Sequence, residues 1–200
     1  MGMAYTKMGE NAFKHLVLNA GVLASAFNPA TGELKEADLL GVTTGGVTFA
    51  TNPTYEDFAA DIDQAPNNMK EYKRKTVEDP TLSGTFAEIT PDLAKMLTAA
   101  GDTSGTSVVK ITPRIDLTAA DFTDVWWIGD YSDINTGANA GFLAIHLMNA
   151  LNTTGFQINA TKNAKGQFAF EWHAHYSIAA QDTVPYEIYI KEGTAESVTP

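Results

Sequence analysis

The chain has 200 residues, of which 44% are hydrophobic and 18% are charged, a composition typical of one globular domain with a hydrophobic core. It contains no cysteine, which excludes disulfide bonds, thiolate metal sites and a cysteine nucleophile. The net charge of −11 argues against a broad nucleic-acid-binding surface, because such a surface needs Lys and Arg facing the phosphates.

The chain also lacks the apolar segments that would direct it to a membrane. Its first residues have no long apolar region of the secretory kind, and no apolar run approaches the roughly 20 residues that span a bilayer. We therefore expect a soluble protein made in a cytoplasm, without a membrane partner. No linker-like tract divides the sequence, so we expect one domain over residues 1–200 with flexible termini.

Hydrophobic residues recur at every second position over most of the chain, which is the pattern of half-buried β-strands. In chain order, this pattern predicts strands at 15–27, 46–52, 73–89, 107–117, 124–129, 143–151, 155–161, 168–178 and 184–190. The turn Asn163–Gly166 is expected to join 155–161 to 168–178 as a hairpin. Trp126 and Trp127 are expected to face opposite sides of a strand, with at least one of them in the core.

One α-helix is expected at 91–100. Thr90 can cap its first turn, Pro91 suits the first helical position, and Gly101 is a natural stop. A single apolar stripe supports the helix and consists of Leu93, Met96, Leu97 and Ala100. A shorter helical turn is expected at 36–40. The chain is therefore predicted to be a mainly antiparallel β protein with one helix packed on a sheet.

Between the strands predicted at 46–52 and 73–89 lies a segment with charges of both signs. Its acidic residues precede a polar turn and are Glu56, Asp57, Asp61 and Asp63. Its basic residues follow the turn and are Lys70, Lys73, Arg74 and Lys75. One interpretation is that the two limbs of a loop or extended hairpin neutralise each other. The alternative is that the acids of one subunit dock on the bases of the next, which makes all eight candidates for inter-subunit contacts.

The segment 171–175 contains the one metal-like pattern in the sequence. His173 and His175 are two residues apart and would face one side of a strand, beside Glu171. Cupin-type metal enzymes use a similar His-x-His pair, but their motif adds a carboxylate a few residues later, whereas the next acid here is Asp182. We therefore expect a polar strand face and no metal or cofactor. Catalytic residues are not predicted either, because the sequence has no nucleophile elbow and no phosphate-binding glycine motif.

The segments between residues 40 and 192 follow a characteristic order. Gly-Val-Thr-Phe at 46–49 is followed by an acidic Asp-Ile-Asp loop with Pro-Asn, a Lys/Arg-rich stretch, and Leu-Ser-Gly-Thr-Phe-Ala-Glu-Ile-Thr-Pro-Asp at 82–92. Near the end, Phe-Glu-Trp-His-Ala-His-Tyr at 170–176 precedes Thr-Val-Pro-Tyr-Glu-Ile-Tyr at 183–189. This order resembles the major tail tube proteins of long-tailed, siphovirus-like bacteriophages.

The resemblance implies an antiparallel β-sandwich or half-barrel with one flanking α-helix and a long charged loop at about 53–80. It implies a non-enzymatic virion protein that assembles in the bacterial host cytoplasm into stacked hexameric rings, forming the tail tube through which DNA is ejected. The charged loop would contact the adjacent ring. An acidic lumen would repel phosphates, so viral DNA would pass without specific binding.

The resemblance also implies a set of partners. These are further copies of the chain, the tape-measure protein, the tail terminator and the distal tail or baseplate proteins. Two alternatives remain open. One is another ring-forming tail or secretion-tube component of the same fold, and the other is a cupin-like metal-dependent enzyme that uses His173 and His175.

Overall fold

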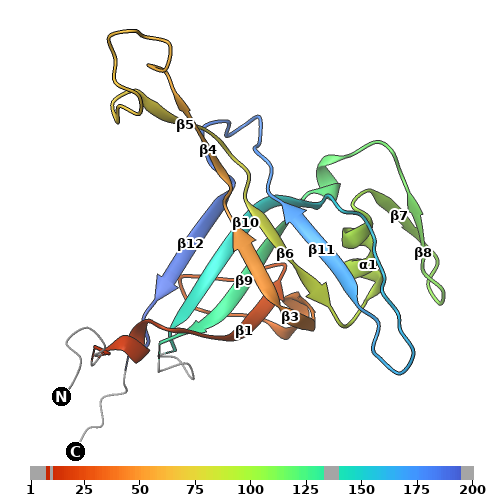
Figure 1. Ribbon diagram of the computed structural model, residues 1–200. Helices are drawn as coiled ribbons and strands as arrows, with labels where there is room; N and C mark the ends of the chain where they lie inside the picture. The colour runs from red at the N-terminus through yellow and green to blue at the C-terminus, as the bar shows by residue number, and fades with distance from the viewer. Residues whose placement is uncertain (1–7, 10, 133–139, 195–200) are drawn as a thin grey trace, which may run out of the picture.

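The computed structural model describes residues 8–9, 11–132 and 140–194, so the expectation of flexible termini falls largely outside the described residues (Figure 1). Its strands are β1 (Val17–Ala24), β2 (Leu39–Gly41), β3 (Thr43–Ala50), β4 (Pro53–Asp57), β5 (Lys73–Glu78), β6 (Thr81–Phe86), β7 (Gly101–Ser104), β8 (Lys110–Pro113), β9 (Thr123–Tyr131), β10 (Phe142–Asn152), β11 (Phe168–His173) and β12 (Tyr186–Lys191). Its helical elements are α1 (Pro91–Thr98) and the short 3-10 helices η1 (Ala12–His15), η2 (Glu36–Asp38) and η3 (Ala119–Asp121). The prediction of a mainly antiparallel β protein with one α-helix is confirmed. In the described part of the chain, no helix has the length and hydropathy needed to cross a membrane.

Eight strands form one antiparallel sheet that is organised around β10. The segment Phe142–Leu147 pairs with β9 on one edge and with β12 on the other. At Leu151 and Asn152, near the end of the strand, the partner on the second edge is β11 instead of β12. The sheet continues from β9 through β1 to β2, and from β11 through β6 to β3. Strand β10 therefore belongs to both halves of the sheet.

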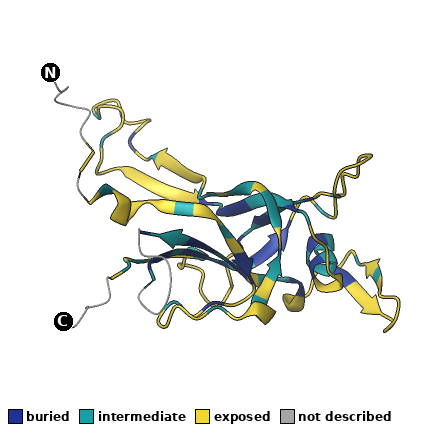
Figure 2. Ribbon diagram, turned by 90° about the horizontal axis from the view of Figure 1, so that it is seen from below, coloured by how far each residue is buried: buried dark blue, intermediate teal, exposed yellow. Residues whose placement is uncertain are grey.

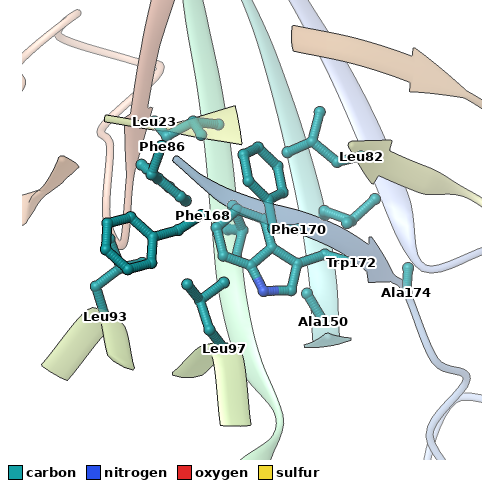
Figure 3. Packing of buried hydrophobic residues seen from close by; sticks show 12 residues of the cluster. Leu23, Leu82, Phe86, Leu93, Leu97, Ala150, Phe168, Phe170, Trp172 and Ala174 are labelled. Carbon is teal, nitrogen blue, oxygen red and sulfur yellow. The ribbon is translucent and has the colours of Figure 1, made fainter. Parts of the chain in front are cut away.

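The two halves of the sheet share one hydrophobic core (Figure 3). At its centre, the ring of Phe170 lies 4.8 Å from that of Phe86 and 4.5 Å from that of Trp172. The other half of the sheet and α1 contribute Leu23, Val125, Leu147, Ala150, Leu93 and Leu97. Burying a large apolar side chain contributes about 1.5–3 kcal/mol, so this cluster is the main source of stability for the fold.

A second, smaller cluster covers the opposite face of β9 and β10. Trp126 packs there against Phe27, with ring centroids 5.6 Å apart, and Phe27 packs against Phe142 at 5.1 Å. The neighbouring Trp127 packs against the main core instead, and its Nε1 donates a hydrogen bond to the carbonyl oxygen of Ala20 at 3.0 Å. The prediction that the two tryptophans face opposite sides is confirmed.

The helix predicted at 91–100 is observed as α1, with a slightly earlier end. The hydroxyl of Thr90 accepts a hydrogen bond from the backbone N–H of Leu93 at 3.2 Å, which is the expected N-terminal cap. The helix ends before Ala99, which has a φ of 68°, and Gly101 begins β7 instead of serving as the stop. The shorter helical turn predicted at 36–40 is observed as η2, which leads directly into β2.

Several predicted strands differ in extent from the observed ones. The strand predicted at 73–89 is divided into β5 and β6 around Pro80, which has no N–H to donate to a strand ladder. Of the strand predicted at 107–117, only β8 forms, and the strand predicted at 168–178 ends at His173. Alternation identifies a face that could be buried, but a strand also requires a neighbour with which to pair.

The predicted hairpin between 155–161 and the following strand is wrong. The structure has only an isolated bridge between Asn159 and Gln167, and β11 pairs with β10 and β6 instead. The alternating apolar residues Phe156 and Ile158 are exposed, so they do not form the buried face that the pattern suggested.

Asn152 joins the two halves of the sheet to the helix. Its side chain is buried, at 2% exposure, and Nδ2 donates to the carbonyl oxygens of Leu97 at 2.7 Å and Gly155 at 3.0 Å. Its Oδ1 accepts from the backbone N–H of Glu171 at 3.0 Å. One amide group therefore satisfies three backbone groups from three different segments.

Replacing Asn152 with alanine should destabilise the fold. The substitution Asn152→Ala leaves buried backbone groups without their partner, which costs about 1–3 kcal/mol. Chemical denaturation would measure the change in the free energy of unfolding. The matched control is Asn159→Ala at an exposed position, which should change that free energy by less than about 0.5 kcal/mol. Equal stabilities of the two variants would contradict the role assigned to Asn152.

Candidate functional site

The charged segment folds as a two-stranded arm that projects from the body of the protein (Figure 1). We define the arm as residues 53–78, in which β4 and β5 pair only with each other. The register runs from Pro53 opposite Glu78 to Asp57 opposite Lys73, and the intervening residues form the tip. Both strands are exposed along most of their length (Figure 2).

The arm exposes large apolar side chains as well as charged ones. The exposed fraction of Phe58, at the tip, is 58%, and the full set is Tyr55, Phe58, Ile62, Tyr72 and Val77. Apolar side chains gathered on an exposed element are typical of surfaces that contact another macromolecule. This set was not predicted from the sequence, although the sequence shows aromatic residues interleaved with the charged ones.

The two charged blocks of the arm do not form ion pairs with each other. The register places Glu56 opposite Arg74 and Asp57 opposite Lys73, so opposite charges are neighbours across the strands. However, the ion pairs described for the arm are Lys70 with Glu71 and Lys75 with Glu78, and neither connects the two blocks. Asp57 instead accepts hydrogen bonds from the backbone N–H groups of Ala59 and Asn68, at 3.0 and 2.7 Å.

Most of the basic side chains are bonded within the arm. Arg74 donates from Nη1 to the carbonyl oxygens of Glu71 and Lys73, at 2.8 and 3.0 Å. Lys73 reaches the side-chain oxygen of Asn68 at 3.4 Å, and Lys75 pairs with Glu78. Three acids differ, because their carboxylates have no hydrogen bond or ion pair with the described residues: Glu56, Asp61 and Asp63. The structure thus divides the eight candidates, and these acids are the charges that remain available for a partner.

A buried polar network fixes the arm to the body. Glu78 is only 6% exposed; one of its carboxylate oxygens binds the Lys75 ammonium, and the other accepts from the Tyr186 hydroxyl at 3.0 Å. Because Tyr186 belongs to β12, this network links the arm to the edge of the sheet. Next to it, the side chain of Asn52 donates to the carbonyl oxygen of Asp79 at 3.1 Å.

The network also shifts the titration of its members. Burial, and then the hydrogen bond to Glu78, raise the pKa of Tyr186, and the hydrogen bond to Glu78 raises the pKa of Lys75. Because folding raises both pKa values, the resulting stabilisation is fully present below their ordinary values of 10.0 and 10.5. It is lost as the pH rises through the raised values, so both groups keep their protons at neutral pH.

The structure does not bring the predicted metal candidates together. His173 Nδ1 lies 2.9 Å from an Asp79 carboxylate oxygen, and its Nε2 lies 3.5 Å from Glu171. His175 lies beyond the end of β11, where its Nδ1 is 3.1 Å from the carbonyl oxygen of Asn149. Within the described residues, no three His, Asp or Glu side chains are grouped in a way that could hold a metal ion.

A second exposed apolar feature lies on β12. This strand pairs with β10 along one edge, and no described strand pairs with its other edge. Its apolar residues Ile188 and Ile190 are both exposed. An exposed edge strand with apolar side chains readily pairs with another chain.

A hollow beside β1 does not resemble a catalytic pocket. It lies between β1 and the segment that carries Phe27, and most of its lining is apolar or glycine. Its charged side chains are Asp130 and Lys191, and the Asp130 carboxylate accepts a hydrogen bond from the side chain of Asn19 at 2.8 Å. The structure therefore gives the hollow no arrangement of nucleophile, base and orienting group.

Comparison with known proteins does not add a family. No protein-family model matches the sequence, and a search of curated proteins gave no significant match.

Replacing Glu78 with glutamine should loosen the arm at its base. The amide of Glu78→Gln can still accept from Tyr186, but it loses the charge that holds Lys75. Hydrogen exchange should become faster for the amides of β4 and β5 and stay unchanged in β9 and β10. Glu71→Gln, which removes only an exposed ion pair with Lys70, is the control and should leave all these rates unchanged. Unchanged exchange in the Glu78 variant would show that the network does not restrain the arm.

Proposed function

We propose that this protein is a self-assembling structural subunit whose copies form stacked hexameric rings, as in the tail tube of a long-tailed bacteriophage. The observation that carries the proposal is the projecting arm, which exposes apolar side chains together with three acids that have no partner in the described chain. An isolated two-stranded hairpin is only marginally stable in water, so docking on a neighbour would supply the packing that the arm lacks.

The edge of the sheet supports lateral association within a ring. Pairing between β12 and a strand of a neighbouring subunit would satisfy its unpaired backbone groups and cover Ile188 and Ile190. Joining the sheets of successive subunits would produce a closed assembly with a continuous inner wall. In this proposal the arm provides contacts between rings, and the sheet edge provides contacts within a ring.

The charge balance fits a conduit for DNA. A net charge of −11 gives a wall that repels phosphates, which favours passage of DNA without specific binding. The order of segments that resembles tail tube proteins points the same way. The proposed partners are further copies of this chain, the tape-measure protein, the tail terminator and the distal tail or baseplate proteins. The proposed location is the virion tail, and the proposed role is structural and not enzymatic.

A second candidate of the same class is another ring-forming tail or secretion-tube component. The exposed edge of β12 favours ring formation equally in both cases, whereas the arm favours stacking. Negative-stain electron microscopy of the purified protein at high concentration separates tube subunits, of a tail or of a secretion system, from components that form single rings. Stacked tubes support a tube subunit, and single rings support a terminator-like component.

Removing an apolar contact from the arm should weaken assembly. Phe58→Ser would lose about 1.5 kcal/mol or more of apolar burial at each contact, which raises the protein concentration needed for assembly by about tenfold. Sedimentation velocity over a concentration series would measure this change. Val42→Ser, an exposed apolar residue outside the arm, should assemble like the wild type. A Phe58→Ser protein that assembles at the wild-type concentration would refute a role for the arm.

A further inference from the structure

We propose that the arm of one copy docks on the opposite end of a second copy, on a surface that carries unpaired lysines. This inference rests on the proposed self-assembly and names the surface that receives the arm. We call it the distal surface and define it as residues 91–121 and 153–167. The first segment contains α1 and the β7–β8 hairpin, and the second is the loop between β10 and β11.

The arm and the distal surface lie on opposite sides of the body. In Figure 1, the arm projects at the upper left, whereas α1, β7 and β8 lie at the right. The same separation is visible from below, where the exposed hairpin β7–β8 is again remote from the arm (Figure 2). An arm that reached the distal surface of its own chain would have to cross the whole body, so its natural partner is another copy.

The charges of the distal surface are opposite to those available on the arm. The ammonium groups of its lysines have no ion pair or hydrogen bond within the described residues, and these lysines are Lys95, Lys110, Lys162 and Lys165. Two of its acids, Asp102 and Asp121, are occupied by Arg114, at 2.8 and 2.7 Å. Counting Arg114, the two segments hold five bases and four acids, whereas the whole chain has a net charge of −11. The acids all lie in residues 91–121, so the positive part of the distal surface is the loop 153–167, where Lys162 and Lys165 match the unpartnered acids of the arm.

The distal surface and the arm also both expose apolar side chains, which makes the fit between the two surfaces more specific. The side chain of Ile115 is completely exposed, and the exposed apolar residues of the distal surface are Val108, Val109, Ile115, Leu117, Phe156 and Ile158. The arm likewise combines exposed aromatic and aliphatic residues with charges. Interfaces typically join a buried apolar centre to a polar rim in which complementary charges set the orientation.

The arm of a second copy is a poorer partner for these acids. Arg74 is bonded to carbonyl oxygens of its own arm, and Lys75 is bonded to the buried Glu78. The four lysines of the distal surface have no such competing bonds. A contact between two different surfaces of one chain also repeats from copy to copy, which produces a ring or an open stack and not a two-fold dimer.

A charge exchange tests the inference. The arm variant Asp61→Lys/Asp63→Lys and the distal variant Lys162→Glu/Lys165→Glu each bring like charges together. Each alone should require at least about tenfold more protein to assemble than the wild type. An equimolar mixture should recover assembly, because each arm then meets a distal surface of opposite charge. Sedimentation velocity gives the assembled fraction, and negative-stain microscopy gives its form.

The control is Lys14→Glu/Lys35→Glu, which changes the net charge as much as the distal variant but at exposed lysines elsewhere. It should assemble like the wild type. Circular dichroism of each variant establishes that it is folded, and recovery in the mixture gives a second check. Normal assembly of the distal variant, or a mixture that stays unassembled, overturns the inference while leaving the proposed function intact. A wild-type protein that remains monomeric at every concentration overturns the proposed function itself.

Discussion

Strand β10 hydrogen-bonds to three other strands, and the remaining structure depends on this arrangement. Its first part holds β9 and β12, and its last residues hold β11, so both halves of the sheet are attached to one strand. The partner changes between Leu147 and Leu151, next to Asn152, whose amide also binds the carbonyl oxygen of Leu97 in α1. The sheet can therefore enclose the core from two sides, and the helix closes it, without a separate connecting layer.

The same arrangement determines where the arm can point. Because β12 lies beside the first part of β10 only, its first residue, Tyr186, lies near the base of the arm and binds Glu78. The hydrogen bond between Tyr186 and Glu78 therefore joins β12, which we assign to contacts within a ring, to the arm, which we assign to contacts between rings.

The sequence allowed some elements to be predicted because their determinants are local. Thr90 caps the helix by a bond to Leu93, only three residues away. Trp126 and Trp127 lie on opposite faces because side chains alternate along a single strand. The partner of β11 was not predictable, because alternation indicates a face and not a neighbour. The charged arm was predicted as a segment, but its available charges were not. Which acids remain unpaired depends on the register of β4 and β5 and on the contact between Lys75 and Glu78.

The restraint at Glu78 has a consequence for the spacing of an assembly. A strand advances about 3.3 Å per residue, so the five residues of β4 extend the arm by roughly 17 Å. If the arm is held rigidly at its base, its length would set the axial distance to the next copy. The flexibility of its side chains would then contribute little to that distance. The repeat of a tube built in this way would be encoded in the number of residues between Asn52 and the tip of the arm.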